Sequence, residues 1–222
     1  MLKIWRRYWY WIGGILFIAL SFFMGLWGSV HLEHIQVIMV FSFMAMLAHQ
    51  VEEYGWPGGF PAVSNILQFG EVEGYERYPF NQNLSFFDNV FTTYTFYIVP
   101  IFFPNLIWLA LAQSLAGFIQ VLAHGIISPL RIKKIYNPGL FTALTLFLPI
   151  GIYMIYYTAI QGATVWDYTL GIVGAIVGYG IVFGIPVALM RNKNSKYPFA
   201  SEEIYGAGDS WKKVITERMN KK

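Results

Sequence analysis

Five residues in three stretches of the chain carry side chains that can hold a metal ion or transfer a proton. His49, Glu52 and Glu53 lie in "AHQVEEYGWPGG", Asn89 lies in "FFDNVFTTYTF", and His124 lies in "GFIQVLAHGI". Imidazole nitrogens and carboxylate oxygens are donors that zinc and non-haem iron accept. A metal bound to them lowers the pKa of a coordinated water, and a neighbouring glutamate can take the released proton. This chemistry requires the side chains to meet, so the elements that carry them must first be established.

The composition indicates that these elements lie in a membrane. Of the 222 residues, 56% are hydrophobic and only 12% are charged, which is too apolar for an ordinary soluble domain. Trp and Tyr gather near the ends of the apolar runs, where the membrane interface favours them. The chain has no cysteine, which excludes disulfides and thiolate metal sites. Its net charge of +3 gives no support for a nucleic-acid partner.

Six apolar runs approach the roughly 20 residues that a membrane-spanning helix needs. They predict helices over residues 8–30, 31–53, 86–99, 103–127, 140–160 and 168–190, the third shortened or bent by Pro100. The Gly- and Pro-rich residues 54–85 are interpreted as a loop with a short interfacial helix. We therefore expect an all-α, polytopic membrane helix bundle over residues 1–190, followed by a polar, solvated cytoplasmic tail over residues 191–222.

The basic residues predict the orientation of this bundle. All 15 Lys and Arg fall in residues 1–7, 54–85, 128–138 and 191–222, and the connections on the opposite side carry none. Because cytoplasmic loops are enriched in Lys and Arg, both termini are expected in the cytoplasm. The chain is accordingly expected to be a multi-pass protein of a prokaryotic plasma membrane.

This topology brings the five candidate residues to one depth, near the cytoplasmic ends of their helices. At ~100° per residue, Glu52 and Glu53 lie within about 60° of His49 around the helix axis. Asn89 and His124 belong to polar stripes on the next two helices, and such stripes turn inward because lipid cannot satisfy them. Taken singly, a glutamate at a helix end or a packing histidine has a purely structural interpretation. Their combination favours a functional site.

A second histidine group, "HLEH" at residues 31–34, needs a separate interpretation. His34 lies 15 residues before His49, which is ~22 Å along a helix. His31 and His34 therefore belong to the outer surface and cannot join the inner cluster. Interfacial solvation is expected there, with an outer metal site or gate as the alternative.

The order of these blocks resembles a bacterial integral membrane protein family named after its HXXEE motif. The resembling segments are "HQVEE" with the following "YGWPGGFP", the stretches around Asn89 and His124, and "YNPGLFTALTLFLPIGIY". The similarity covers about residues 31–160. It implies a shared fold and a shared site at the five candidate residues. It implies no particular reaction, since the family is uncharacterised.

The first hypothesis is an intramembrane enzyme, a metal-dependent hydrolase acting on a lipid or a hydrophobic peptide end from the cytoplasmic leaflet. His49, Glu53 and His124 would hold a divalent metal, zinc or iron. Glu52, Asn89 and His124 are the candidate catalytic residues, with Glu52 as general base or acid and Asn89 orienting water or stabilising an oxyanion.

Three alternatives stay open at this point. One is a non-haem metal oxygenase or desaturase, which uses similar ligands. Another is a small proton-coupled transporter, with His34, Ser42, His49 and Glu52 along one polar stripe. The third is a structural or assembly protein in which the cluster only joins helices.

The basic residues Arg131, Lys133 and Lys134 are interpreted either as positive-inside anchors or as a binding site for a lipid phosphate. A homo-oligomer is also left open.

Overall fold

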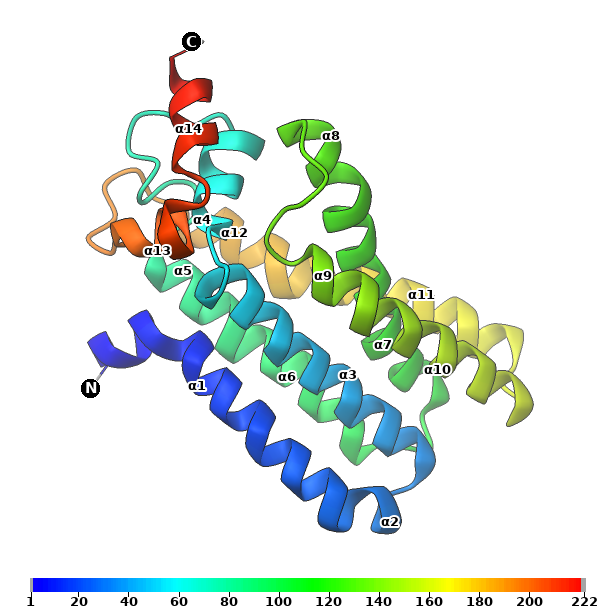
Figure 1. Cartoon of the computed structure of the whole chain (residues 1–222). Helices are drawn as coiled ribbons and strands as arrows, with labels where there is room; N and C mark the ends of the chain where they lie inside the picture. Colours follow the sequence, from blue (N-terminus) through cyan, green and yellow to red (C-terminus); the bar gives the residue numbers. More distant parts are fainter. Residues whose placement is uncertain (1, 221–222) are drawn as a thin grey trace.

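The computed structural model describes residues 2–220, and within them the chain is helical with no strand (Figure 1). Five continuous helices are long and apolar enough to cross a membrane: Leu2–His31, His34–Gly55, Ile107–Ile132, Leu140–Ile160 and Val165–Met190. This confirms the expected all-α membrane bundle. Lys221 and Lys222, which belong to the predicted cytoplasmic basic set, lie outside the described residues.

The third predicted helix forms but does not count among these five. It runs from Gln82 to Phe102 as α5 (Gln82–Phe86), η4 (Phe87–Thr92), α6 (Thr93–Ile98) and η5 (Val99–Phe102). Asn81 caps its start by accepting hydrogen bonds from the backbone N–H groups of Asn83 and Leu84. A sixth crossing and the inward orientation of both termini therefore stay predictions.

The five long helices contain π-helical turns between their α-helical parts. The parts are α1 (Leu2–Phe23), η1 (Met24–Gly28) and α2 (Ser29–His31); α3 (His34–Gln50) and η2 (Val51–Gly55); α7 (Ile107–Leu122), η6 (Ala123–Ile127) and α8 (Ser128–Ile132); α9 (Leu140–Thr142), η7 (Ala143–Phe147) and α10 (Leu148–Ile160); α11 (Val165–Tyr179), η8 (Gly180–Gly184) and α12 (Ile185–Met190). The turns η2, η4 and η6 carry the glutamate pair, Asn89 and His124. Since π-turns frequently occur at functional sites, this coincidence fits a site, although η1, η7 and η8 show that such turns also occur elsewhere.

Helices α3 and α7 form the middle of the bundle. Helix α3 packs against α1 and α7, and α7 packs against α10 and α11 (Figure 1). Two glycines of α11 allow its close approach to α7, because a Cβ on Gly171 would lie 2.6 Å from the Leu111 Cβ and one on Gly174 2.9 Å from the Ala112 Cβ. The two central helices thus carry His49 and His124 side by side.

The segment after residue 190 differs from the solvated tail that was expected. It contains α13 (Ser201–Tyr205), η9 (Ala207–Asp209) and α14 (Lys212–Met219), and its apolar side chains Phe199, Ile204, Trp211 and Ile215 are buried. They share a core with residues of α4 (Phe60–Ala62) and η3 (Val63–Gln68), the short helix expected in the loop. We call residues 56–81 and 191–220 together the polar lobe. It covers the end of the bundle near both termini (Figure 1). The polar average composition of residues 191–222 led to the prediction of a solvated tail, although a few apolar side chains in it are spaced so that they pack.

Candidate metal centre

Three predicted metal ligands meet in the structure. His49 of α3, Glu53 of η2 and His124 of η6 are buried, and their ligand atoms all lie within 4.8 Å of one another. The Glu53 Oε1 atom lies 3.4 Å from Nε2 of His124 and 3.6 Å from Nε2 of His49. Charge-assisted hydrogen bonds are shorter, about 2.7–2.9 Å. A tetrahedral ion with bonds of about 2.1 Å separates its ligand atoms by about 3.4 Å, which matches the spacings of Glu53 to the two histidines.

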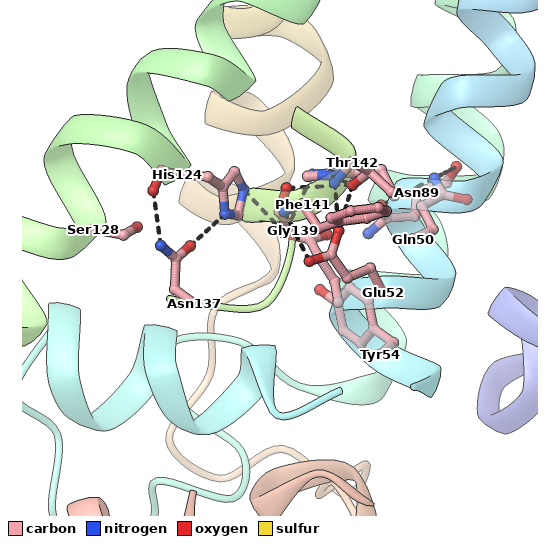
Figure 2. A network of polar contacts seen from close by, with 12 residues as sticks. Gln50, Glu52, Tyr54, Asn89, His124, Ser128, Asn137, Gly139, Phe141 and Thr142 are labelled. Carbon is pink, nitrogen blue, oxygen red and sulfur yellow. Dashed lines mark hydrogen bonds and ion pairs between the residues drawn. The ribbon is translucent and has the colours of Figure 1, made fainter. Parts of the chain in front are cut away.

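The orientation of His124 is set by Asn137, in the loop before α9. The His124 Nδ1 atom lies 2.7 Å from the Asn137 Oδ1, and the Asn137 amide nitrogen donates to the His124 backbone oxygen at 2.7 Å (Figure 2). An amide oxygen only accepts, so Nδ1 carries the proton. The Nε2 lone pair of His124 therefore points toward Glu53 and is available to a metal.

His49 is oriented in the same way through Thr142. The Thr142 hydroxyl lies 2.8 Å from the His49 Nδ1 and donates its single proton to Glu52 Oε2 at 2.6 Å. It must therefore accept from the Nδ1–H of His49, which leaves Nε2 unprotonated. That Nε2 atom is buried and has no hydrogen-bond partner among the described residues. Buried polar atoms are rarely left unpaired, and a metal ion would satisfy this one.

Glu52, predicted as general base or acid, is held by hydrogen bonds to the segment around Leu140. Its two carboxylate oxygens accept from the backbone N–H groups of Phe141 at 3.0 Å and Thr142 at 2.8 Å, from the Thr142 hydroxyl, and from the Tyr136 hydroxyl at 3.3 Å (Figure 2). Burial and the Glu52 charge raise the pKa of Tyr136, which keeps its hydroxyl protonated. Glu52 thus holds the N-terminus of the helix that begins at Leu140, a favourable place for a carboxylate. Because its acceptor positions are occupied, we assign it a positioning role through Thr142 rather than the role of general base.

Gly139 gives the two imidazoles the room to approach each other. The rings of His49 and His124 lie 4.8 Å apart between centroids and meet edge to face. Gly139 has φ +101°, and a Cβ at this position would lie 2.6 Å from Cε1 of both rings. Only glycine adopts this backbone conformation readily and leaves that space.

Asn89, the other predicted catalytic residue, lies beside the cluster but its amide is engaged. It donates to the Ser85 backbone oxygen at 2.9 Å and accepts from the Gln50 side chain at 3.1 Å. The neighbouring Asp88 is buried and lines the same cavity as Glu53. Sequence reasoning did not include Asp88 in the site, although its place directly before Asn89 was an available signal.

The cluster opens onto a cavity of about 240 Å³. His49, Glu53 and His124 line it together with Asp88, and apolar side chains such as Met46 line much of the rest. Since three protein ligands leave a coordination position vacant on a tetrahedral metal, a bound ion would meet a molecule in this cavity.

The outer histidines contact aromatic residues near them in space, and the His34 ring also packs on Tyr157. His31 Nδ1 lies 2.9 Å from the Trp27 backbone oxygen, with its ring stacked on Trp27. His34 Nε2 lies 2.8 Å from the Tyr153 hydroxyl. Among the residues that the structure describes, the only group of three or more His, Asp or Glu able to hold a metal is the inner one. The outer pair is therefore separate from the cluster, as predicted, and an outer metal site gains no support.

Comparison with known proteins adds the family. Residues 40–154, more than half of the chain, match the model of a family described as "Protein of unknown function with HXXEE motif". No curated protein and no solved structure matches the chain. The matched range contains the three candidate ligands and also Glu52, Asn137, Gly139 and Thr142, which position them. Within the motif, Glu53 lies beside the two histidines and Glu52 binds the start of the helix at Leu140. The chain therefore belongs to the HXXEE-motif family.

Proposed function

We propose that this protein is an intramembrane metal-dependent hydrolase that acts on a lipid or a hydrophobic peptide end. The observation that carries the proposal is the unpartnered Nε2 atom of His49, buried beside His124 and Glu53 at the wall of a cavity. Two histidines and one glutamate form a known set of ligands for hydrolytic zinc. By the positive-inside argument, the site faces the cytoplasmic leaflet of a prokaryotic plasma membrane.

A divalent metal bound there would supply Lewis acidity and an activated water. The chain's own residues then have distinct tasks. Asn137 and Thr142 hold the imidazoles in the tautomer that leaves Nε2 available. Asp88 is the candidate general base, because its carboxyl group lines the same cavity and does not belong to the ligand set. The apolar cavity wall limits water around the reacting bond.

Oxygenase or desaturase chemistry is the second candidate, because two histidines and one carboxylate also form the facial triad of non-haem iron enzymes. Transport has less support. This cavity is lined by His49 but not by Ser42, His34 or Glu52, so it does not follow the predicted stripe. The identity of the metal separates hydrolase from oxygenase.

The test is elemental analysis of protein purified without added metal. We expect about one divalent ion per chain, zinc for the hydrolase, and loss of the ion in Glu53→Gln. The matched control is Asp88→Asn, which removes a carboxylate from the same cavity but outside the ligand set. It should keep the ion and lose turnover of a membrane-lipid extract or a hydrophobic peptide pool, followed by mass spectrometry. A folded protein that neither holds nor takes up zinc or iron would contradict the proposal, and iron with oxygen-dependent products would favour the second candidate.

A further inference from the structure

Tyr97 of α6 has a hydroxyl group that the protein itself does not use. The side chain is 2% exposed and lines the cavity that His49, Glu53 and His124 also line. Its hydroxyl has no hydrogen-bond partner among the described residues. Leaving a buried hydroxyl unpaired is unfavourable, so a polar group of an occupant is the natural partner.

Tyr97 lies deeper in the bundle than the cluster. Gln113 of α7 donates to the backbone oxygens of both Met39 and Tyr97, which places these residues at one level. The Tyr97 ring lies 6.4 Å from the ring of Phe43, between centroids. Phe43 precedes His49 by six residues on α3, which is ~9 Å at 1.5 Å per residue. The Tyr97 ring therefore lies at least about two helical turns beyond the cluster along the bundle, away from the polar lobe.

Arg131 marks the other end of the same cavity. It follows His124 by seven residues, which is two turns along one helix face and ~10 Å. Of the Lys and Arg residues that the structure describes, it alone lines the cavity. Its guanidinium is exposed and makes no ion pair or hydrogen bond with the described residues. The neighbouring Gln68 donates to Ser128 at 2.7 Å and completes a polar rim. A guanidinium at such a rim suits a phosphate group.

We propose that the occupant of this cavity is a phosphate-bearing amphiphile whose chain carries an oxygen function, bound lengthwise between Arg131 and Tyr97. Arg131 binds the head group, the metal cluster faces the middle of the molecule, and the Tyr97 hydroxyl hydrogen-bonds the oxygen of the chain. The inference rests on the proposed function, because it assigns the substrate class of that site. A plain saturated chain would leave Tyr97 unpaired and is the poorer ligand.

The experiment measures binding of defined probes to the full protein in phosphatidylcholine nanodiscs. The probes are hexadecyl phosphate, ω-hydroxyhexadecyl phosphate, hexadecyltrimethylammonium and inorganic phosphate. We expect the ω-hydroxy probe to bind about tenfold more tightly than the plain phosphate, which corresponds to one added hydrogen bond. The cationic amphiphile should not compete, and inorganic phosphate alone should bind weakly, because a lipid-like source is proposed.

Two variants separate the contacts. Tyr97→Phe should abolish the preference for the ω-hydroxyl group while keeping the affinity for hexadecyl phosphate, and it should not lower the unfolding temperature, because the hydroxyl has no partner in the protein. Arg131→Gln should weaken both phosphates about tenfold or more. The controls are Tyr94→Phe, which removes a hydroxyl that donates to Gln50 and does not line the cavity, and Lys213→Gln, which removes one exposed positive charge of α14. Neither should change probe binding.

The outcomes separate this inference from the proposed function. If the protein holds its metal but Tyr97→Phe and Arg131→Gln bind all probes like the parent protein, the substrate assignment is wrong and the hydrolase proposal stands. If Tyr97→Phe and Arg131→Gln change probe binding as expected but no metal is found, the ligand assignment stands and the hydrolase proposal is wrong. Preferential binding of inorganic phosphate, or of a hydrophobic peptide with a free carboxylate over both lipid-like phosphates, would also overturn the assignment.

Discussion

The inner and outer histidine pairs of this chain differ in environment more than in sequence. His31 and His34 lie three residues apart on a turn at one end of the bundle, a spacing that suits metal ligands. Yet their rings are exposed, and their contacts are with Trp27 for His31 and with Tyr153 and Tyr157 for His34. His49 and His124 lie 75 positions apart in sequence, but they are buried together, and each has its Nδ1 atom fixed by a neighbour. The comparison teaches that a ligand histidine is recognised by what holds its other nitrogen and by burial, and less by local spacing.

The largest difference is expected when the two pairs are substituted in parallel. His49→Gln and His124→Gln should each remove the metal, because a site with two remaining protein ligands binds a divalent ion weakly. His31→Gln and His34→Gln should keep about one ion per chain. Elemental analysis of the four purified variants checks this, with circular dichroism to show that each is helical. Loss of the ion in an outer variant would break the distinction between the two pairs.

Glycine substitutions test the space between the inner imidazoles. Gly139→Ala should remove the metal and lower the free energy of unfolding by about 2–4 kcal/mol, since the new Cβ meets both rings and the backbone has positive φ. Gly162, before α11, also has positive φ, at +80°, but a Cβ there meets nothing within 4 Å.

Gly162→Ala is therefore the matched control, which carries the backbone strain without the collision. It should cost about 1 kcal/mol and leave the metal content unchanged. Thermal unfolding with and without zinc measures both effects. Equal metal content in the two alanine variants would show that the imidazoles can move apart and that Gly139 does not shape the site.

The smallest effect is expected from the group that orients His49. Thr142→Val removes the acceptor of the Nδ1 proton and one donor to Glu52, and it should weaken metal affinity about 10–100-fold without abolishing it. Thr145→Val, three residues further along the same helix, removes a hydroxyl that only donates to the Phe141 backbone oxygen and should bind metal normally. Competition with a zinc chelator measures the affinities, and identical values for the two valine variants would mean that the orienting hydrogen bond is unimportant.

The sequence predicted the helical membrane bundle and the meeting of His49, Glu53 and His124, because hydropathy, basic residues and helix rotation are local properties. It assigned Glu53 to the metal and Glu52 to acid–base catalysis, but it did not predict the hydrogen bonds that occupy Glu52. Both lie within about 60° of His49 on one helix face, and the group that occupies Glu52 comes from residues 136–142, far along the chain. The positive φ of Gly139 likewise depends on the path of that loop.

The polar lobe was the second feature that sequence reasoning missed. Charged residues dominate the average of residues 191–222, while a few apolar side chains decide whether the segment packs. Trp211, directly before α14, and Ile215 on α14 lie four residues apart and are buried together with Phe199 and Ile204. Their partners in residues 60–80 lie more than 100 positions away, so no local pattern pointed to them.

The hydrogen bonds of Glu52 have a consequence for how the protein matures. Because this carboxylate ties the start of the helix at Leu140 to η2, directly after α3, the protein's own hydrogen bonds hold the candidate ligands in place. Metal loading can then be the last stage of biogenesis, after membrane insertion, and a chelator should empty the protein without melting it. A cell could in this way keep a reserve of assembled but idle molecules and switch them on through its metal supply.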